Sequence, residues 1–331
     1  MRRILITGGS GFIGCRLAQV ARSADREITV VSAINTDSER KRCEILANAG
    51  IRVNVATLED RPALAKLVAN QDAIIHLAAA QHEAGYSEMH FRRVNVDGTR
   101  ILLQLAAEAG VKRFVHGSTI GVYGSTDRKG VVDEASPLAP DNPYGRSKAE
   151  AEMVVAQFAS QLEVAIVRIS ETYGPGDIRL LKLFQAIAKK RFVTLGSGKN
   201  IHQLIYVDDL AHGLLAAASA PEAVNSTCIL AGREILTTDE MATAIASALG
   251  NSWAVRHLPL WPFDIVASIM EKTMSPLGMR PPLHRRRLDF FRKSLRFSTE
   301  RAAQILGFEP KVRFADGARL TAHWYREHAF L

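Results

Sequence analysis

The sequence feature that most constrains the fold is a glycine-rich stretch that follows a short apolar run near the N-terminus. Residues 4–6 are Ile-Leu-Ile, and residues 7–14 are Thr-Gly-Gly-Ser-Gly-Phe-Ile-Gly. In a dinucleotide-binding turn Gly8 permits the tight turn, Gly11 lets the backbone approach the phosphates, and Gly14 lets the helix pack on the strand. Ordinary strand-to-helix turns can carry the same spacing. Placed directly after an apolar strand, the stretch predicts a dinucleotide site.

Apolar runs typical of strands alternate with helical patterns through the first half of the chain. This alternation predicts an α/β fold, a Rossmann-type doubly wound parallel sheet with helices on both faces. We predict strands near 3–6, 28–32, 51–55, 73–77, 112–116 and 164–169, and helices near 12–22, 61–69, 95–109 and 144–161.

The pattern changes after Gly174, where the elements become shorter and prolines more frequent. We therefore predict a dinucleotide-binding domain over residues 1–169, with a later return near 200–220. A smaller, interleaved α/β substrate-binding lobe is expected over residues 170–331. No linker-like stretch separates the two parts, so they should pack against each other.

Composition and charge exclude several classes of function. The net charge is +8, and much of it lies in the basic segment 280–301. This segment is a solvated face or, alternatively, a contact for an anionic substrate or a peripheral membrane surface. It lacks the aromatic platforms or reading helix of a nucleic-acid interface. No run is long enough to span a membrane.

The cysteines and the N-terminus indicate a cytoplasmic protein. Cys15, Cys43 and Cys228 are odd in number and show no paired spacing, which is typical of reduced thiols. No signal peptide is evident, and no metal site is suggested.

Two pairs of residues suggest acid/base chemistry. Tyr144 and Lys148 stand four residues apart at the start of a helix, so both project from one face. A tyrosine that acts as a base at pH 7 needs its pKa lowered by about three units. An adjacent ammonium can contribute to this, although such pairs also arise by chance. Ser118 and Thr119 follow a strand, where a hydroxyl either holds a substrate oxygen or caps a turn.

A series of ordered motifs resembles one family. The motifs are the turn at Gly8, Gly11 and Gly14, Asp72-x-x-x-His76-Leu77-Ala78-Ala79, Asn95-Val96-Asp97-Gly98-Thr99, Ser118-Thr119 before Val122-Tyr123-Gly124, Tyr144-x-x-x-Lys148, Tyr173-Gly174-Pro175-Gly176 and Tyr206-Val207-Asp208-Asp209. Together they resemble the extended short-chain dehydrogenases/reductases, which include sugar-nucleotide epimerases, dehydratases and 3β-hydroxysteroid dehydrogenases. The resemblance covers residues 3 to about 218.

The resemblance implies roles for individual residues. Tyr144 would be the acid/base, Lys148 would lower its pKa and bind the nicotinamide ribose, and Thr119 would orient the substrate oxygen during hydride transfer. The implied cofactor-binding residues are Gly8, Gly11, Phe12, Ile13, Gly14, Ser32, Leu58, Leu77, Ala78, Ala79, Asn95, Tyr144, Lys148 and Ile169.

One departure from the family concerns the cofactor. Ser32 stands where NAD-preferring relatives carry an aspartate for the ribose hydroxyls. Without that carboxylate a 2′-phosphate is not repelled, so NADP is slightly favoured over NAD. The basic run 40–42 lies further along the chain than an arginine for this phosphate is expected.

Other departures concern the substrate. His202 replaces the arginine that clamps the diphosphate in sugar-nucleotide enzymes, and Glu171 replaces an asparagine. Glu171 is either a second acid/base or the ion-pair partner of Arg168 or Arg179. Ser118, Glu171 and His202 are therefore the candidate substrate residues. Residues 258–270 are apolar, which suits a lipid-like substrate or the core of the C-terminal lobe.

We interpret the chain as an NAD(P)-dependent oxidoreductase acting on a secondary alcohol or ketone. The preferred substrate is a hydroxysteroid-like or other apolar cyclic alcohol. One alternative is a nucleotide-sugar epimerase or dehydratase with transient hydride transfer, and another is a non-catalytic dinucleotide-binding regulatory protein. By the resemblance, the helices near 95–109 and 144–161 would pair in a homodimer.

Overall fold

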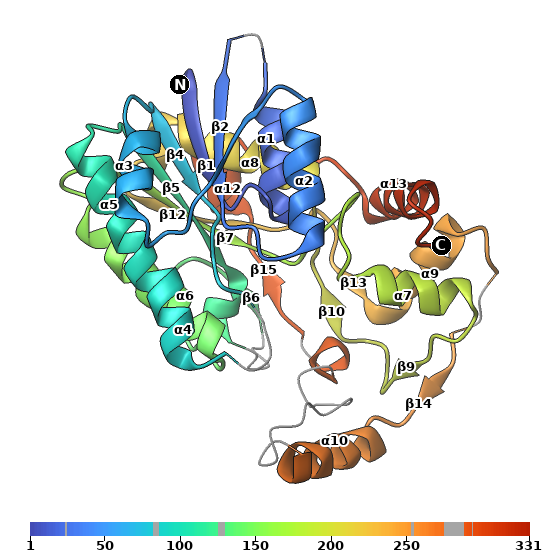
Figure 1. Cartoon of the computed structure of the whole chain (residues 1–331). Helices are drawn as coiled ribbons and strands as arrows, with labels where there is room; N and C mark the ends of the chain where they lie inside the picture. Colours follow the sequence, from blue (N-terminus) through green and yellow to red (C-terminus); the bar gives the residue numbers. More distant parts are fainter. Residues whose placement is uncertain (24, 82–85, 125–129, 253–254, 275–287, 293) are drawn as a thin grey trace.

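A seven-stranded parallel sheet organises the computed structural model (Figure 1). The structure describes residues 1–23, 25–81, 86–124, 130–252, 255–274, 288–292 and 294–331. The strand order is β12-β7-β5-β4-β1-β2-β3. The strands are β1 (Arg3–Thr7), β2 (Glu27–Ser32), β3 (Arg52–Val55), β4 (Ala73–His76), β5 (Arg113–Thr119), β7 (Glu163–Ile169) and β12 (Ser226–Leu230).

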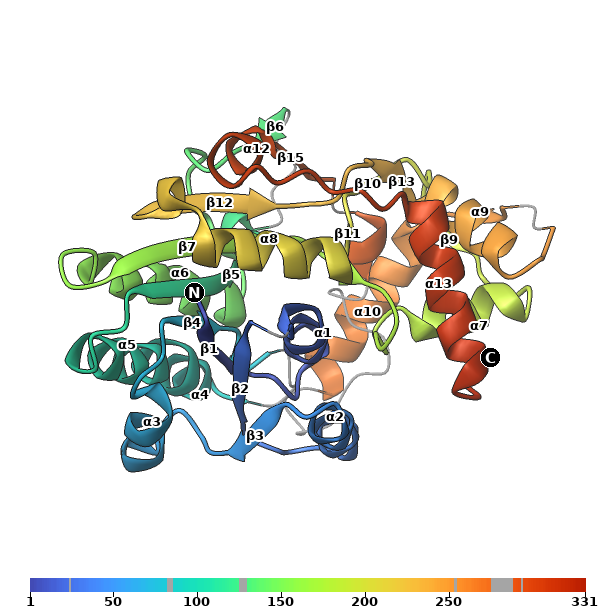
Figure 2. The same ribbon diagram turned by 90° about the horizontal axis from the view of Figure 1, so that it is seen from above.

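Alternating side chains of the strands bury both faces of this sheet. Ile4 and Ile6 of β1 face one helical layer, while Leu5 faces the other. Figure 2 shows the two layers on opposite sides of the sheet. The layer on Ile4 and Ile6 contains α1 (Phe12–Ala21) and α8 (Val207–Ser219), and the opposite layer contains α3 (Arg61–Val68), α5 (Gly98–Glu108) and α6 (Pro143–Gln157). The doubly wound α/β architecture is confirmed.

The six expected strands are all present, and the helices near 12–22, 61–69 and 144–161 are confirmed. The helix expected near 95–109 instead begins as a π-helical turn, η1 (Arg93–Asp97), before α5. The sequence analysis missed β12 and also α2 (Asp37–Asn48). Thr36 and Glu39 form a capping box at the start of α2, a signal that the sequence contains.

The C-terminal part contains helices joined by short strands. Tyr173, Phe184 and Tyr325 are almost fully buried in its core. The main helices are α7 (Leu181–Ala188), α9 (Thr238–Ala248), α10 (Trp261–Met274) and α13 (Phe314–Glu327). The short elements of this part are β8 (Thr172–Tyr173), β9 (Thr194–Leu195), β10 (Ile201–His202), β11 (Ile205–Tyr206), β13 (Leu236–Thr237), β14 (His257–Leu258), β15 (Arg296–Phe297) and α12 (Glu300–Leu306). Two further short elements, α4 (Glu88–Arg92) and β6 (Val131–Val132), lie earlier in the chain.

Helix α10 corrects one expectation. Figure 1 shows it at the bottom of the view, away from the central sheet. Trp261 is 67% exposed and Ile269 is 56% exposed, while Ala267 is buried. The idea that residues 258–270 form the core of the C-terminal part is therefore wrong.

Several other expectations concern single features. Cys15, Cys43 and Cys228 are free and buried. Residues 275–287 and 293, which hold most of the basic segment, lie outside the described residues. None of the helices in the described part of the chain combines the length and the apolar character needed to cross a bilayer.

Candidate active site

The site lies where the strand order reverses, between β1 and β4. In doubly wound sheets a crevice opens at this point, beyond the carboxyl ends of the strands. The glycine turn follows β1, and Leu77, Ala78 and Ala79 follow β4. The amide of Leu77 donates to the carbonyl of Thr7 at 3.2 Å, and the amide of Ala78 donates to the Thr7 hydroxyl at 3.2 Å. These bonds hold the two chain segments side by side.

The glycine turn forms a cradle that larger residues would fill. A Cβ on Gly8 would lie 2.7 Å from the amide nitrogen of Ala78, and a Cβ on Gly14 would lie 2.3 Å from the carbonyl oxygen of Gly8. Helix α1 begins at Phe12 without a side-chain cap, so its first amides are free for an anion. This arrangement fits the pyrophosphate of a dinucleotide.

The end of β2 is polar and lies beside a cation. Ser32 Oγ lies 2.6 Å from Ser10 Oγ. Arg42, on α2, donates to the carbonyl of Ser10 at 3.1 Å. The guanidinium of Arg42 therefore reaches the glycine turn, although from the sequence we expected residues 40–42 to lie too far along the chain to do so. Recognising the capping box of α2 would have predicted a helix that begins at Asp37, so that Arg42 lies in its second turn.

Tyr144 and Thr119 come together at the carboxyl end of β5. Asn142 caps α6 by accepting from the amide of Gly145 at 2.9 Å, which fixes the first turn that carries Tyr144. Burial raises the pKa of Tyr144 to about 12, against the lowering effects of the Arg179 charge and a hydrogen bond with Thr119. At pH 7 the phenol is therefore protonated and can donate a proton.

Lys148 lies one turn further along α6 and is fully buried. Its Nζ lies 3.2 Å from Nε2 of His116, on β5. Burial lowers the pKa of Lys148 to about 8, and the negative charge of Glu152 opposes this shift. The lysine therefore remains mostly protonated at pH 7, as the predicted role requires.

Asn95 ties the crevice to α6 from the π-helical turn. Its Oδ1 accepts from the amide of Ala80 at 2.7 Å, and its Nδ2 donates to Ser147 Oγ at 2.9 Å. Two other predicted cofactor residues flank the crevice: Leu58 is buried and packs against Gly98, and Ile169 ends β7. Asn95 thus positions the start of α6 and the segment after β4.

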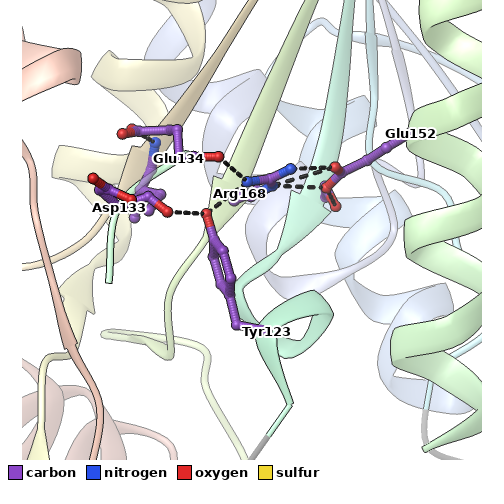
Figure 3. A network of polar contacts seen from close by, with 7 residues as sticks. Tyr123, Asp133, Glu134, Glu152 and Arg168 are labelled. Atoms are coloured by element: carbon purple, nitrogen blue, oxygen red, sulfur yellow. Dashed lines mark hydrogen bonds and ion pairs between the residues drawn. The ribbon is translucent and has the colours of Figure 1, made fainter. Parts of the chain in front are cut away.

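Ser118 belongs to a buried network around Glu152 and Arg168. Figure 3 shows Glu152 and Arg168 from close by. The Ser118 hydroxyl donates to Glu152 at 2.5 Å, and Glu152 accepts from Arg168 Nη2 at 2.7 Å. Arg168 Nη1 also donates to the hydroxyl of Tyr123 at 2.6 Å and to the carbonyl of Glu134 at 3.1 Å. Arg168 is therefore the partner of Glu152, which corrects its suggested pairing with Glu171.

Glu171 and His202 form a second candidate pair. His202 Nδ1 lies 3.7 Å from Glu171 Oε2, and His202 Nε2 lies 2.9 Å from Thr238 Oγ1. The Glu171 side chain is 62% exposed, whereas His202 is buried. Glu171 therefore faces solvent, while His202 is held in place by its neighbours.

Arg179 is a residue that the sequence analysis did not assign to the site. Its guanidinium carbon lies 5.8 Å from the centre of the Phe12 ring, at the N-terminus of α1. It donates to Asp177 at 3.0 Å and also to the carbonyl of Thr172. The arginine brings a positive charge to both the glycine turn and Tyr144. Arg179 stands three residues after Gly176, in the segment that follows β8, and this closeness to a family motif could have marked it as a site residue.

The fold and the site define an NAD(P)-dependent enzyme of the extended short-chain dehydrogenase/reductase type. The model of the NAD dependent epimerase/dehydratase family matches residues 4–231. The chain belongs to this family, as the ordered motifs had suggested.

Relatives resemble the chain over nearly its whole length. A dTDP-glucose 4,6-dehydratase of Streptomyces niveus is 31% identical, covering 98% of this chain and 93% of the relative. A UDP-glucose 4-epimerase of Vibrio cholerae is 26% identical, covering 97% and 94%. The solved structure of a Streptomyces venezuelae dTDP-glucose 4,6-dehydratase, with NAD bound, has a TM-score of 0.76 and 29% identity, covering 98% and 97%.

Proposed function

We propose that the protein oxidises and reduces a sugar hydroxyl of a nucleotide sugar during an epimerisation or dehydration, with no net use of the dinucleotide. The similarity to a dTDP-glucose 4,6-dehydratase over 98% of the chain carries this proposal. The relatives favour this alternative over the hydroxysteroid that the sequence analysis preferred.

The residues at the carboxyl end of β5 support acid/base chemistry. Thr119 holds the substrate oxygen beside Tyr144, which donates a proton when the carbonyl is reduced and accepts one when the alcohol is oxidised. When bound, the nicotinamide would supply the hydride acceptor and donor for the substrate carbon. The positive charge of Arg179 favours the phenolate, although burial still holds the pKa of Tyr144 at about 12.

The turn after Thr119 favours epimerisation over dehydration. Elimination of water needs a further acid/base near the reacting carbon atoms, beyond the group that serves hydride transfer. Ile120 and Gly121 follow Thr119 directly, and neither can carry a proton. Glu171, at 62% exposure, is the carboxylate that would serve a dehydratase. The identity to dehydratases keeps that reaction as the second candidate.

Product analysis separates the candidates. The purified protein is incubated with UDP-glucose or dTDP-glucose and with NAD or NADP, and products are separated by chromatography and mass spectrometry. An epimerase forms an isomer of unchanged mass, whereas a dehydratase forms a product lighter by one water. Formation of neither product from a broad set of nucleotide sugars would contradict the proposal.

Tyr144→Phe tests the assigned acid/base. We expect turnover to fall by about 10²- to 10⁴-fold, because the phenyl ring keeps the shape but cannot move a proton. The dissociation constant of the dinucleotide, measured by calorimetry, should change little. Tyr173→Phe is the matched control, since it removes a buried tyrosine hydroxyl that makes no hydrogen bond with any described residue.

We propose further that the cofactor is NADP. Ser32 and Arg42 support this, because they combine a neutral hydroxyl with a cation near the glycine turn. Ser32→Asp should weaken binding of NADP more than binding of NAD, and Arg42→Gln should do the same. An unchanged ratio of the two dissociation constants in both variants would contradict the preference.

We also propose a homodimer formed through α5 and α6. Met89 on α4 is 78% exposed and Met153 on α6 is 61% exposed, so this side of the protein presents apolar surface. Sedimentation velocity of the wild type and of Met153→Glu tests the contact. A monomeric wild-type protein would contradict it.

A further inference from the structure

His116 is a buried imidazole next to α6, the helix that carries Tyr144 and Lys148. His116 lies on β5, three residues before Thr119, and its side chain has no exposed surface. Its Nε2 lies 3.2 Å from Nζ of Lys148. Its Nδ1 makes no hydrogen bond with any described residue. A buried imidazole with one nitrogen left without a partner is uncommon, because the cost of desolvating that nitrogen is then not compensated by a hydrogen bond.

The contact with Lys148 determines which imidazole nitrogen carries the proton. A lysine ammonium has three donors and no acceptor, so Nε2 must accept from it. In a neutral imidazole the proton then lies on Nδ1. Burial and the nearby charge of Lys148 both hold the pKa of His116 well below its usual value, which keeps the ring neutral.

We propose that His116 is a positioning residue that holds Lys148 as a protonated donor in one rotamer through this Nε2 contact. The proposal deepens the proposed function, on which it rests for the role of Lys148. Lysine has four side-chain torsions, and confining it to one rotamer costs conformational entropy. The acceptor on β5 fixes those torsions before a dinucleotide arrives, and so lowers the cost of binding.

Glu152 and His76 also lie near Lys148, but both already have hydrogen-bond partners, so His116 is the acceptor for its ammonium. Glu152, on α6 itself, favours the ammonium but is already bound by Arg168 and Ser118. His76, on β4, lies beside His116, with ring centres 5.5 Å apart. Both ring nitrogens of His76 already lie within hydrogen-bond distance of hydroxyls, those of Thr7 and Thr99.

His76 provides a matched control. It is equally buried and stands opposite His116 in the register of β4 and β5. Substitution of either histidine disturbs the same core. A change in the behaviour of Lys148 that appears in His116 variants and not in His76→Gln therefore reports the contact rather than the fold.

The first test needs no turnover. Two-bond ¹H–¹⁵N correlation spectra of histidine-labelled protein at pH 7 report the tautomer of each ring, and His116→Gln assigns the signal. We expect the Nδ1–H tautomer for His116. The Nε2–H tautomer, or a protonated ring, would overturn the proposal. This result stands whether or not nucleotide sugars are substrates, so it separates this proposal from the proposed function.

The second test measures the pH dependence of kcat/KM in wild type, His116→Phe and His116→Gln. Phenylalanine fills the space without an acceptor, so Lys148 should lose its proton more readily. The alkaline fall in activity should then move to lower pH by about one unit. Glutamine restores an acceptor and should move the fall back. An unmoved alkaline limb in a folded His116→Phe protein would overturn the proposal, as would equal shifts in both variants.

Discussion

Two buried polar clusters, around Glu152 and around Lys148, lie one helical turn apart on α6. They differ in how the charged group is paired. At Glu152 the carboxylate meets the guanidinium of Arg168, and the remaining hydrogen-bonding groups find partners. At Lys148 the ammonium meets a neutral imidazole, and the other imidazole nitrogen has no hydrogen-bond partner in the described part of the chain. The first cluster is self-contained. The second leaves a positive charge available for a phenolate or a ribose.

The difference indicates which cluster stabilises the fold and which supports the proposed chemistry. Breaking a buried ion pair leaves a bare charge and costs several kcal/mol. Burial of a lysine without an ion pair instead destabilises the fold, and the lowered pKa of Lys148 reflects the cost of burying its charge. Three measurements of stability test this difference between the two clusters.

Removal of Arg168 should have the largest effect on stability. Arg168→Met leaves Glu152 buried and unpaired, so the free energy of unfolding should fall by about 3–5 kcal/mol in urea titrations. The double variant with Glu152→Gln should recover most of the loss, because no charge is then stranded. A double variant as unstable as Arg168→Met would show that packing, rather than charge, holds this cluster.

The pH dependence of stability should report the neutral histidines. Burial lowers the pKa of His76 to about 3, whereas the unfolded side chain titrates near 6.5. Between these values the unfolded state binds more protons, so stability should fall as pH falls from 6.5, by up to about 1.4 kcal/mol per pH unit for this group. His76→Gln should flatten the curve measured by urea unfolding, and an identical slope would refute this assignment.

Lys148→Met should have the smallest effect on stability, with the opposite sign. The pKa of about 8 corresponds to a cost on the order of 3 kcal/mol for burying the ammonium, and the substitution removes this cost. The gain is partly offset, because His116 Nε2 loses the donor of its hydrogen bond. We expect a gain of about 1–2 kcal/mol in the free energy of unfolding, with turnover lost. A protein that is less stable than wild type would indicate that Lys148 packs as a structural residue.

The sequence predicted the fold better than it predicted the site. The glycine turn and the strands follow from local patterns, because apolar runs and glycine spacing act over a few residues. Strand β12 was missed because it joins the sheet beside β7, some sixty residues further along the chain. The contact between His116 and Lys148 depends on how α6 packs on β5, which no local pattern encodes.

The relatives do not support the hydroxysteroid-like substrate that was preferred from the sequence. The apolar residues 258–270 matched a lipid-like pocket, but apolarity alone does not tell whether a helix face is covered. In the structure Trp261 and Ile269 are exposed. Ser118 was expected to meet a substrate, yet its hydroxyl donates to Glu152. Both cases concern side-chain direction, which a sequence pattern leaves open.

The π-helical turn at Arg93–Asp97 holds one residue more than an α-helical turn of the same height. That additional residue sets the angle at which Asn95 leaves its helix. Deleting a neighbour would rotate the amide by about 100°, away from Ala80 and Ser147. An engineered deletion here would therefore be a way to loosen the crevice without altering any side chain that lines it.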